Sequence, residues 1–151
     1  MSTLTPVAKT QFLIGTTTTT ASGDTFSTVG SVMDMGTVSA TFKDVPVETI
    51  DNALVRHLKG TEDPGITSLK IAFDAGDAGQ LALETALADQ TNDYNLRFIL
   101  PNKATTTGTG TIIDVKGKIM GSDIVIGTPN NVVQRSVSLG LNSIRTFTAA
   151  S

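Results

Sequence analysis

The sequence predicts a mainly β domain with a single helix, and three observations lead to that prediction. Short segments rich in Val, Ile, Phe and Thr alternate between apolar and polar residues, as strands of a half-buried sheet do. Gly, Pro, Asn and Asp stand between these segments, where turns are expected. Only one stretch has the spacing of an amphipathic helix. We therefore expect a β-sandwich or partial barrel flanked by one α-helix.

The length and composition indicate one folded domain. With 151 residues, 39% of them hydrophobic and 17% charged, the chain suits a single core, so residues 1–151 are treated as one domain. No apolar run approaches the roughly 20 residues of a membrane-spanning helix. Residues 1–11 lack the pattern of a signal peptide, which makes assembly in a cytoplasm the default expectation. We expect residues 1–9 and 142–151 to form extended arms.

Three strands are expected before the middle of the chain. Residues 9–14 form the first, which Gly15 and the threonine run 16–20 end, and that run is interpreted as a loop. Residues 26–30 form a weak second strand. Residues 36–43 form a better third strand, because apolar and polar residues alternate along it. The polar face of this third strand carries Thr37, Ser39 and Thr41.

The alternating pattern stops over residues 44–65, which are interpreted as a long loop. Pro46 opens the segment, polar residues dominate it, and Asp63-Pro64-Gly65 places Pro and Gly where a type II turn needs them. Its middle, residues 50–58, has a composition compatible with a helical turn or two. A loop of this length usually carries function or becomes ordered on a partner.

The one helix is expected at about residues 77–89, directly after a strand at 66–73. Asp77 is suited to the N-cap, and Gln80 stands at the third helical position, from which its side chain is expected to reach back to the cap. The helix face expected to pack on the sheet is narrow and consists of small residues, namely Gly79, Ala82, Leu83, Ala86 and Leu87.

The last third of the chain again reads as strands. Residues 94–100 form one strand, and a Thr- and Gly-rich loop follows to residue 110. Residues 111–119 and 124–126 form either a hairpin or one bent strand. Residues 132–141 form the final strand, with an uncharged, small polar face. The polar faces of these strands carry Asp114, Lys116 and Lys118 on the first pair of segments and Gln134, Ser136 and Ser138 on the last.

The sequence offers little for catalysis or for cofactors. His57 is the only histidine and Cys is absent, so metal binding would depend on carboxylates, whose spacing matches no calcium loop. The loop at 105–110 lacks the Lys of a phosphate-binding P-loop. The Lys and Arg residues are scattered singly and the net charge is −3, which argues against tight binding of nucleic acid. We expect no catalytic residue, no metal and no cofactor, and we expect His57 to be solvated or at an interface.

The order of these elements resembles that of the tail tube proteins of long-tailed, non-contractile bacteriophages. The resemblance rests on the strand at 36–42, the loop at 44–65, the strand-helix-strand unit at 66–100 and the final strand at 131–139, and it covers nearly the whole chain. It implies a structural subunit of the virion tail, without a membrane step.

The resemblance implies hexameric rings whose strands join into a continuous inner barrel. These rings would stack into a hollow conduit for DNA ejection, with tape measure, tail tip and tail terminator proteins as partners and with transient, non-specific passage of DNA. Residues expected to reach the neighbouring ring are Val47, Glu48, Ile50, Asp51, Leu54, Arg56, His57, Lys59, Glu62 and Asp63. Residues expected to face the lumen or a neighbouring subunit are the polar-face residues given above for 36–43, 111–119 and 132–141.

Three other classes of protein remain open. An immunoglobulin-like adhesin or decoration domain shares short strands and Thr-rich loops, although a helix between strands speaks against it. The inner tube of a contractile injection system has the same subunit architecture and differs by its sheath. An enzyme would require an acid and a hydroxyl group close to His57.

Overall fold

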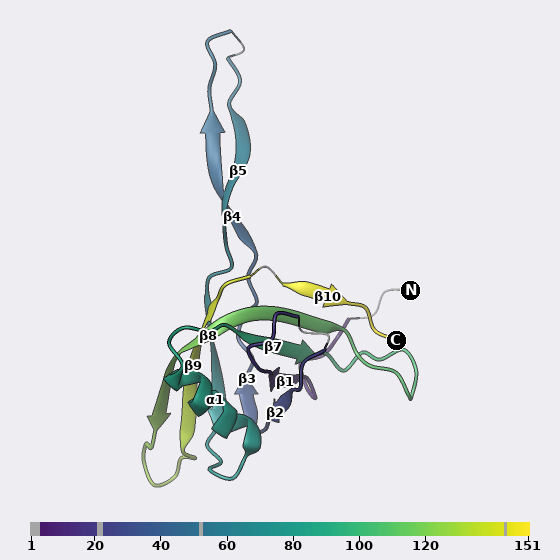
Figure 1. The fold of residues 1–151 in the computed structure, drawn as a ribbon, viewed down its shortest axis with the longest axis vertical. Helices are drawn as coiled ribbons and strands as arrows, with labels where there is room; N and C mark the ends of the chain where they lie inside the picture. The colour runs from purple at the N-terminus through teal and green to yellow at the C-terminus, as the bar shows by residue number, and fades with distance from the viewer. Residues whose placement is uncertain (1–3, 21–22, 52, 144) are drawn as a thin grey trace.

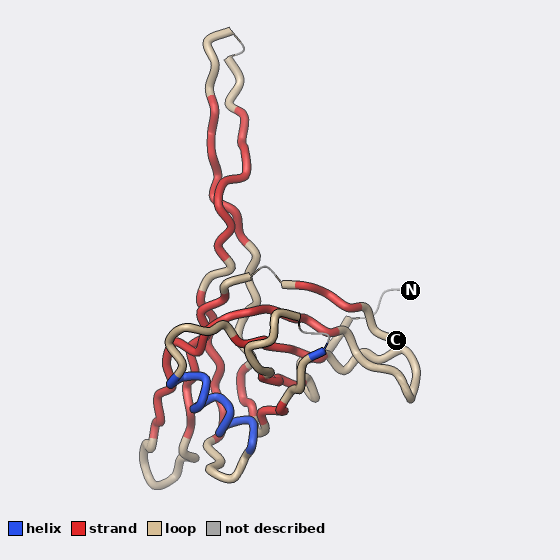
Figure 2. Tube along the Cα trace, in the orientation of Figure 1, coloured by secondary structure: helices blue, strands red, loops and turns tan. Residues whose placement is uncertain are grey.

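The computed structural model describes residues 4–20, 23–51, 53–143 and 145–151, and strands dominate it (Figures 1 and 2). The mainly β fold with one helix is therefore confirmed. In chain order the elements are β1 (Gln11–Ile14), β2 (Ser27–Val29), β3 (Val32–Asp34), β4 (Thr41–Val47), β5 (Arg56–Asp63), β6 (Ile66–Ala72), α1 (Ala78–Ala88), β7 (Tyr94–Ile99), β8 (Ile112–Val125), β9 (Gln134–Leu141) and β10 (Thr146–Thr148).

One antiparallel sheet forms the body of the molecule, in the order β2-β1-β7-β8-β9-β6-β3, with β10 also paired to β8. The sheet curls so that its two halves share a core, but it stays open, because β2 and β3 do not pair among the described residues. The core side chains come from both halves and from α1, and they are Phe12, Ile14, Val29, Leu69, Ile71, Leu83, Ala86, Leu96, Phe98, Val115, Ile119, Val137, Leu139 and Leu141.

Strand β8 joins the two halves. Its first part pairs with β7 on one side and with β10 on the other, while its second part pairs with β9. The register shifts between Ile119 and Gly121, where one extra residue, Met120, forms a bulge. A bulge of this kind bends a strand and increases its twist. Of the two arrangements left open by the sequence, one bent strand is therefore the correct one.

Helix α1 packs against β8 and β2, as its small-residue face predicts. The backbone of Gly79 lies so close to β2 that a Cβ atom there would be 2.3 Å from the carbonyl oxygen of Thr28. Asp77 is the N-cap, and its carboxylate accepts from the Gln80 backbone N–H at 3.1 Å. The carboxylate of Asp77 also accepts from the backbone N–H of Gly30, which ties the helix start to the β2–β3 turn.

The predicted hydrogen bond from the Gln80 side chain back to the N-cap residue Asp77 does not form. The Gln80 side chain is buried and bonds three other backbone groups instead: it accepts from the N–H of Asp74 and donates to the carbonyl oxygens of Ala72 and Gly30. These groups lie at the end of β6 and at the β2–β3 turn. Because a buried, unpaired backbone group is costly, satisfying them outweighs the local capping bond.

The strand expected at 36–43 begins later, at Thr41, and β3 precedes it. Gly36 has a φ of 71°, a conformation that residues with a side chain rarely adopt, and a Cβ atom there would be 2.3 Å from the carbonyl oxygen of Ser68. The alternation of residues 36–40 therefore belongs to a turn packed on β6, not to a strand.

The prediction of a long loop at 44–65 is also wrong, because most of this segment forms a β-hairpin. Strands β4 and β5 pair with each other alone and project from the body (Figure 1). No helix forms at 50–58 among the described residues. A single turn closes the tip, where the Ala53 N–H donates to the Thr49 carbonyl oxygen at 3.3 Å, and Arg56 begins β5. The turn at residues 63–65 agrees with expectation, since Gly65 has a φ of 82° and its N–H bonds the Asp63 side chain. We call residues 41–63 the arm.

Candidate assembly surfaces

The arm has two different faces. Residues Asp44 and Lys59 stand opposite each other in the ladder, and so do Val45 and Leu58. Because successive side chains of a strand point to opposite sides, these two pairs lie on opposite faces. The polar face carries Phe42, Asp44, Pro46, His57 and Lys59, and the apolar face carries Lys43, Val45, Val47, Arg56 and Leu58.

Side chains on the polar face contact one another. A ring nitrogen of His57, Nδ1, lies 2.9 Å from the carboxylate of Asp44, and the Lys59 ammonium lies 4.9 Å from the centre of the Phe42 ring. Such exposed pairs contribute little to stability individually. His57, Asp44 and Lys59 on this face thus have contacts within the arm.

The apolar face and the tip of the arm have no cover within the subunit. Val45 is 42% exposed and Leu58 56%, and at the tip Leu54 is 59% and Ile50 fully exposed. A two-stranded hairpin standing alone in water is marginally stable at best. The arm therefore has the properties of a segment that packs on another surface.

The residues predicted to reach a neighbouring ring all lie on the arm. Val47 ends β4, Glu48 to Leu54 include the tip, and Arg56 begins β5. The remaining predicted residues follow along β5, and they are His57, Lys59, Glu62 and Asp63.

An enzymatic role for His57 gains no support from this geometry, although Asp44 is an acid within hydrogen-bond reach. The side chain of His57 is 66% exposed and that of Asp44 58%. Catalytic pairs act in sites from which water is largely excluded, because low dielectric strengthens their electrostatic effect. The pair lies on a projecting hairpin instead.

Two strand edges of the body are open. Beyond Gly117, β8 is paired with β9 on one side, and no strand pairs with its other side among the described residues. Strand β3 stands at the end of the sheet beyond β6. These are the two outer edges of the four-stranded section β8-β9-β6-β3. Unpaired edges offer hydrogen-bond donors and acceptors to another strand.

The outward face of this section is open and carries small polar side chains. Ser138 pairs with Ser68 and Ser136 with Lys70, while Gln134 pairs with Ala72. The buried side chains alternate with them along β9, as the sequence predicts. The structure therefore brings Gln134, Ser136 and Ser138 together on one surface.

Of the other predicted lumen residues, Lys118 stands opposite Gly140 on the outward face of the same section, and the remaining ones lie elsewhere. Thr37 and Ser39 belong to the turn before β4, where the Thr37 N–H donates to the Thr67 hydroxyl group, and Thr41 begins the arm. Asp114 forms an ion pair with Arg97 at 2.8 Å. Lys116 donates to the carbonyl oxygen of Thr19, and Lys118 pairs with Asp93, an interaction that lowers the pKa of the Asp93 carboxyl group.

The threonine-rich loop that Lys116 contacts is anchored at Asp24. The Asp24 carboxylate accepts hydrogen bonds from Asn95, Thr16 and Thr25. Burial raises the pKa of Asp24, but these hydrogen bonds lower it by more, so that it falls from 3.8 to about 2.

Asp24 should therefore contribute to stability in a pH-dependent way. A carboxyl group with a lowered pKa in the folded state stabilises the fold at pH values above its unfolded pKa, and this contribution disappears as the pH falls through the folded value. Urea unfolding should show the chain to be more stable than Asp24→Asn at pH 7, with a difference that shrinks between pH 3.8 and about 2. A difference that is constant over this range would contradict the assignment.

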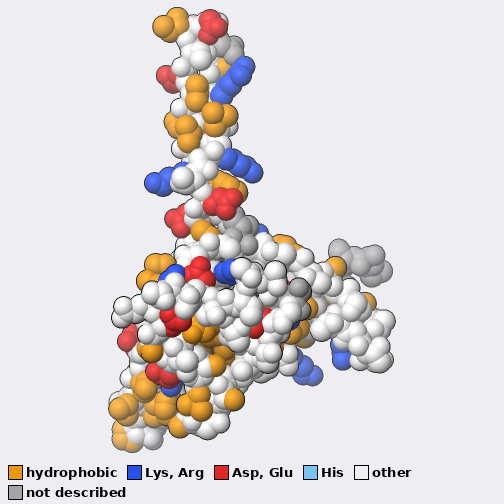
Figure 3. Space-filling model, in the orientation of Figure 1, with side chains coloured by type: hydrophobic (Ala, Val, Ile, Leu, Met, Phe, Trp, Pro, Cys, Tyr) orange, Lys and Arg blue, Asp and Glu red, His pale blue; other side chains and the backbone are white. Residues whose placement is uncertain are grey.

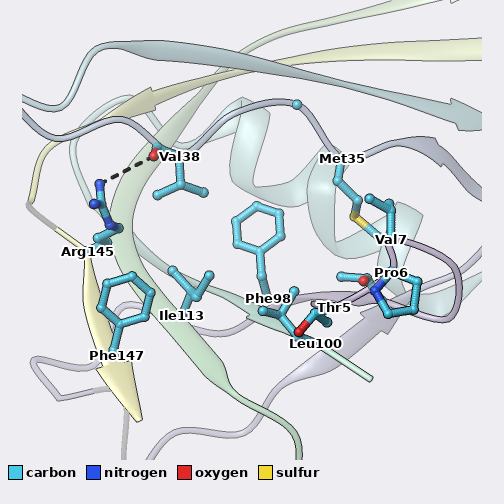
Figure 4. Close-up of a pocket in the computed structure, with 12 residues that line it drawn as sticks. Thr5, Pro6, Val7, Met35, Val38, Phe98, Leu100, Ile113, Arg145 and Phe147 are labelled. Atoms are coloured by element: carbon cyan, nitrogen blue, oxygen red, sulfur yellow. Dashed lines mark hydrogen bonds between the residues drawn. The ribbon is translucent and has the colours of Figure 1, made fainter. Parts of the chain in front are cut away.

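An apolar cavity of about 400 Å³ lies under the N-terminal segment and β10 (Figure 4). Pro6, Val38 and Phe98 line it, and the Arg145 guanidinium at its rim donates to the Val38 carbonyl oxygen at 3.5 Å. The predicted C-terminal arm contributes β10, which pairs with β8 in this subunit. Residues 1–3 and 144 of the two predicted arms lie outside the described residues. Both described terminal segments thus lie against the body.

A second exposed apolar patch lies at the turn between β8 and β9, and sequence reasoning missed it. The side chains there are between 49% and 71% exposed, and hydrophobic atoms are visible at this end in Figure 3. The sequence feature that could have predicted this patch is the apolar run directly before Gly127. We call these residues the β8–β9 end, and they are Ile124, Val125, Ile126 and Val132. In the ladder Val125 lies on the outward face with Asp123, and Ile124 lies on the opposite face, so the exposed apolar side chains surround the end of the hairpin.

Metal sites and membrane-spanning helices are two further features to consider. No group of three or more His, Asp or Glu side chains that could hold a metal ion occurs among the described residues. In the same part of the chain, no helix has the length and apolar character needed to cross a membrane.

Comparison with known proteins shows what this fold is similar to. No protein-family model matches the chain, and no curated protein matches it by sequence. Among solved structures, a sheath/tube terminator of the extracellular contractile injection system PVC matches with a TM-score of 0.70 and 12% identity, covering 98% of this chain and 99% of that one. A chain of the anti-feeding prophage baseplate, a six-fold symmetrised structure, matches with a TM-score of 0.70 and 14% identity, covering 100% and 99%.

The SPP1 tail tube also matches, with a TM-score of 0.63 and 14% identity over 97% of this chain and 81% of that one. The chain therefore has the fold that is found in tail tubes and in components of phage-like injection systems. At these identities the likeness concerns the fold.

Proposed function

We propose that this chain is a structural, non-catalytic subunit of a virion tail tube. In this proposal it forms hexameric rings that stack into a hollow conduit for DNA ejection. The observation that carries the proposal is the combination of two open sheet edges with a projecting, uncovered arm on the fold of tail tubes. One subunit alone leaves all three without partners, and self-assembly supplies partners for all of them.

Ring closure would use the two open edges. The edge of β8 beyond Gly117 in one subunit pairs with β3 of the next, so the section β8-β9-β6-β3 continues from subunit to subunit. When the last subunit meets the first, neither of these two edges remains open, which removes the aggregation hazard at both. Two similar structures, the anti-feeding prophage baseplate and the tail of a GTA particle, have six-fold symmetry, which supports a ring of six.

The lumen would be lined by the outward face of that section. Gln134, Ser136 and Ser138 on this face are uncharged, and Lys70 of β6 and Asp123 of β8 both stand opposite Ser136, so the face carries charges of both signs and no basic stripe that would hold a phosphate backbone. The net charge of −3 per chain also disfavours tight binding of DNA. DNA would pass without being held. Tape measure, tail tip and terminator proteins would be further partners in the tail, after assembly in the host cytoplasm.

The inner tube of a contractile injection system is a second candidate, because two of the similar structures come from such a system. The subunit architecture is compatible with both. Electron microscopy of native particles distinguishes them, since a contractile system has a sheath around the tube and a long-tailed, non-contractile phage does not. An adhesin or decoration domain gains no comparable support, because it would leave the two open edges unpaired.

Sedimentation velocity tests the proposal. The purified chain should convert, as its concentration rises, from a slow species to rings and then to polydisperse long assemblies. A single monomeric species at every concentration, also after seeding with fragments of native tails, would overturn it.

A further inference from the structure

We propose that the apolar face of the arm binds the β8–β9 end of a second copy, with Arg56 of one copy beside Asp123 of the other. This inference rests on the proposed function and deepens it, because it names the surface that receives the arm. Four observations carry it: the positions of the two surfaces, their apolar character, their unpaired charges and the absence of cover for either within the subunit.

The two surfaces lie at opposite ends of the molecule. The arm projects at one end of the longest axis, and the turn between β8 and β9 lies at the other end (Figure 1). A contact between opposite ends of identical subunits is head-to-tail, and such a contact repeats with every added copy. It therefore extends an assembly along the axis, in a direction different from that of the β8 and β3 edges.

Both surfaces are apolar and lack cover. Val45 and Leu58 of the arm are about half exposed, as are Ile124 and Val125 of the β8–β9 end. Exposed apolar clusters of this kind, rimmed by polar residues, are typical of protein interaction sites. A second copy of the chain covers both clusters at once, because each subunit supplies one and receives the other.

The charges on the two surfaces are opposite. Lys43 and Arg56 share the apolar face of the arm, and Asp123 lies two residues before Val125 on the outward face of β8. None of these three side chains has an ion-pair partner among the described residues, whereas His57 and Asp44 on the polar face pair with each other. Charge complementarity across an interface fixes its register and excludes wrong partners. Lys59 on the polar face has no ion-pair partner either, but its ammonium lies against the Phe42 ring. The apolar face is therefore the one that combines uncovered apolar side chains with unpaired cations.

Charge reversal tests this pairing. Arg56→Glu and Asp123→Arg should each raise the concentration needed for polymerisation roughly tenfold or more, because each places like charges together. The double variant restores opposite charges and should return that concentration to within about threefold of the original chain. Lys59→Glu makes the same change in charge on the polar face and is the matched control, which should leave polymerisation nearly unchanged.

A cross-link provides a second measurement if a charge variant fails to fold. The chain has no Cys, so the double variant Leu58→Cys, Ile126→Cys introduces the only two thiols. Oxidised assemblies of it should give a ladder of covalent multimers on a non-reducing gel, and Leu58→Cys with Ser68→Cys, on the open sheet face, should not.

The outcomes separate the two proposals. If the original chain does not polymerise, the proposed function fails. If it polymerises but the double charge variant is no better than the single variants, or Lys59→Glu is equally damaging, the docking inference alone is overturned. A cross-link ladder from the Ser68 control, with none from the Ile126 variant, would overturn it too.

Discussion

Replacing Val47 and Leu58 with Thr is expected to abolish tube growth at concentrations where the original chain polymerises. Both residues lie on the apolar face of the arm. Thr keeps the preference for extended backbone but removes much of the apolar surface that each contact buries. A loss of about 3 kcal/mol for each contact raises the concentration needed for assembly roughly a hundredfold. Pelleting assays over a concentration series, with negative-stain images of the pellets, measure this directly.

The matched control for the arm is His57→Thr with Lys59→Thr, on the opposite face of the same hairpin. This variant should assemble like the original chain, and normal assembly would also show that His57 has no required role. The body should be unaffected in both variants, with the free energy of unfolding changed by about 0.5 kcal/mol or less, because surface positions have small effects. Assembly that survives the apolar-face change, or that fails equally in the control, would contradict the role assigned to this face.

Replacing Leu69 with Ala is expected to have the largest effect on stability. Leu69 lies in β6, is fully buried and belongs to the core shared by both halves of the sheet. Removing its side chain leaves a cavity and should lower the free energy of unfolding by about 2–5 kcal/mol, as measured by urea unfolding.

The neighbouring outward position in β6 gives the control for the core. Ile66→Ala removes a similar side chain from the same strand, but Ile66 is 75% exposed, so the unfolding free energy of the subunit should change by about 0.5 kcal/mol or less. Equal losses at the two positions would mean that the curled sheet described above is not the folded state in solution.

The sequence predicted the body of the domain well because its strands face a core. In β6 and β9 every second side chain is buried, and this produces the alternation that identifies a strand. The helix was predicted for the same reason, since its small-residue face packs closely on β2. When one side of an element is buried, apolar residues recur along the sequence with the period of that element.

The hairpin structure of the arm was not predicted because neither of its faces packs against a core. Its strands mix Lys43 and Arg56 with apolar residues on one face, and Pro46 interrupts the other, which a hairpin exposed on both sides tolerates. Gln80 was misassigned because its partners come from β6 and the β2–β3 turn, which local capping rules do not include. The open edges of β8 and β3 depend on which strands pair, and composition carries no information about that.

The candidate site was therefore predictable in part. Residues of the arm were assigned to inter-ring contact from the resemblance and from the length of the segment, and they lie together on one projecting element. Gln134, Ser136 and Ser138 also lie together, because one face of β9 is open. Asp114 and Lys116 do not join them, since Asp114 pairs with Arg97 of β7 and Lys116 bonds a threonine-rich loop far away in the sequence. Such long-range cover cannot be inferred from one strand's own pattern.

End-on cryo-electron microscopy of assemblies grown from the pure chain would show directly how the subunits are joined. We predict rings of six subunits around an open channel, with β8 of each subunit paired to β3 of the next. Solid filaments, rings without a channel, or subunits joined through surfaces other than these two edges would contradict it.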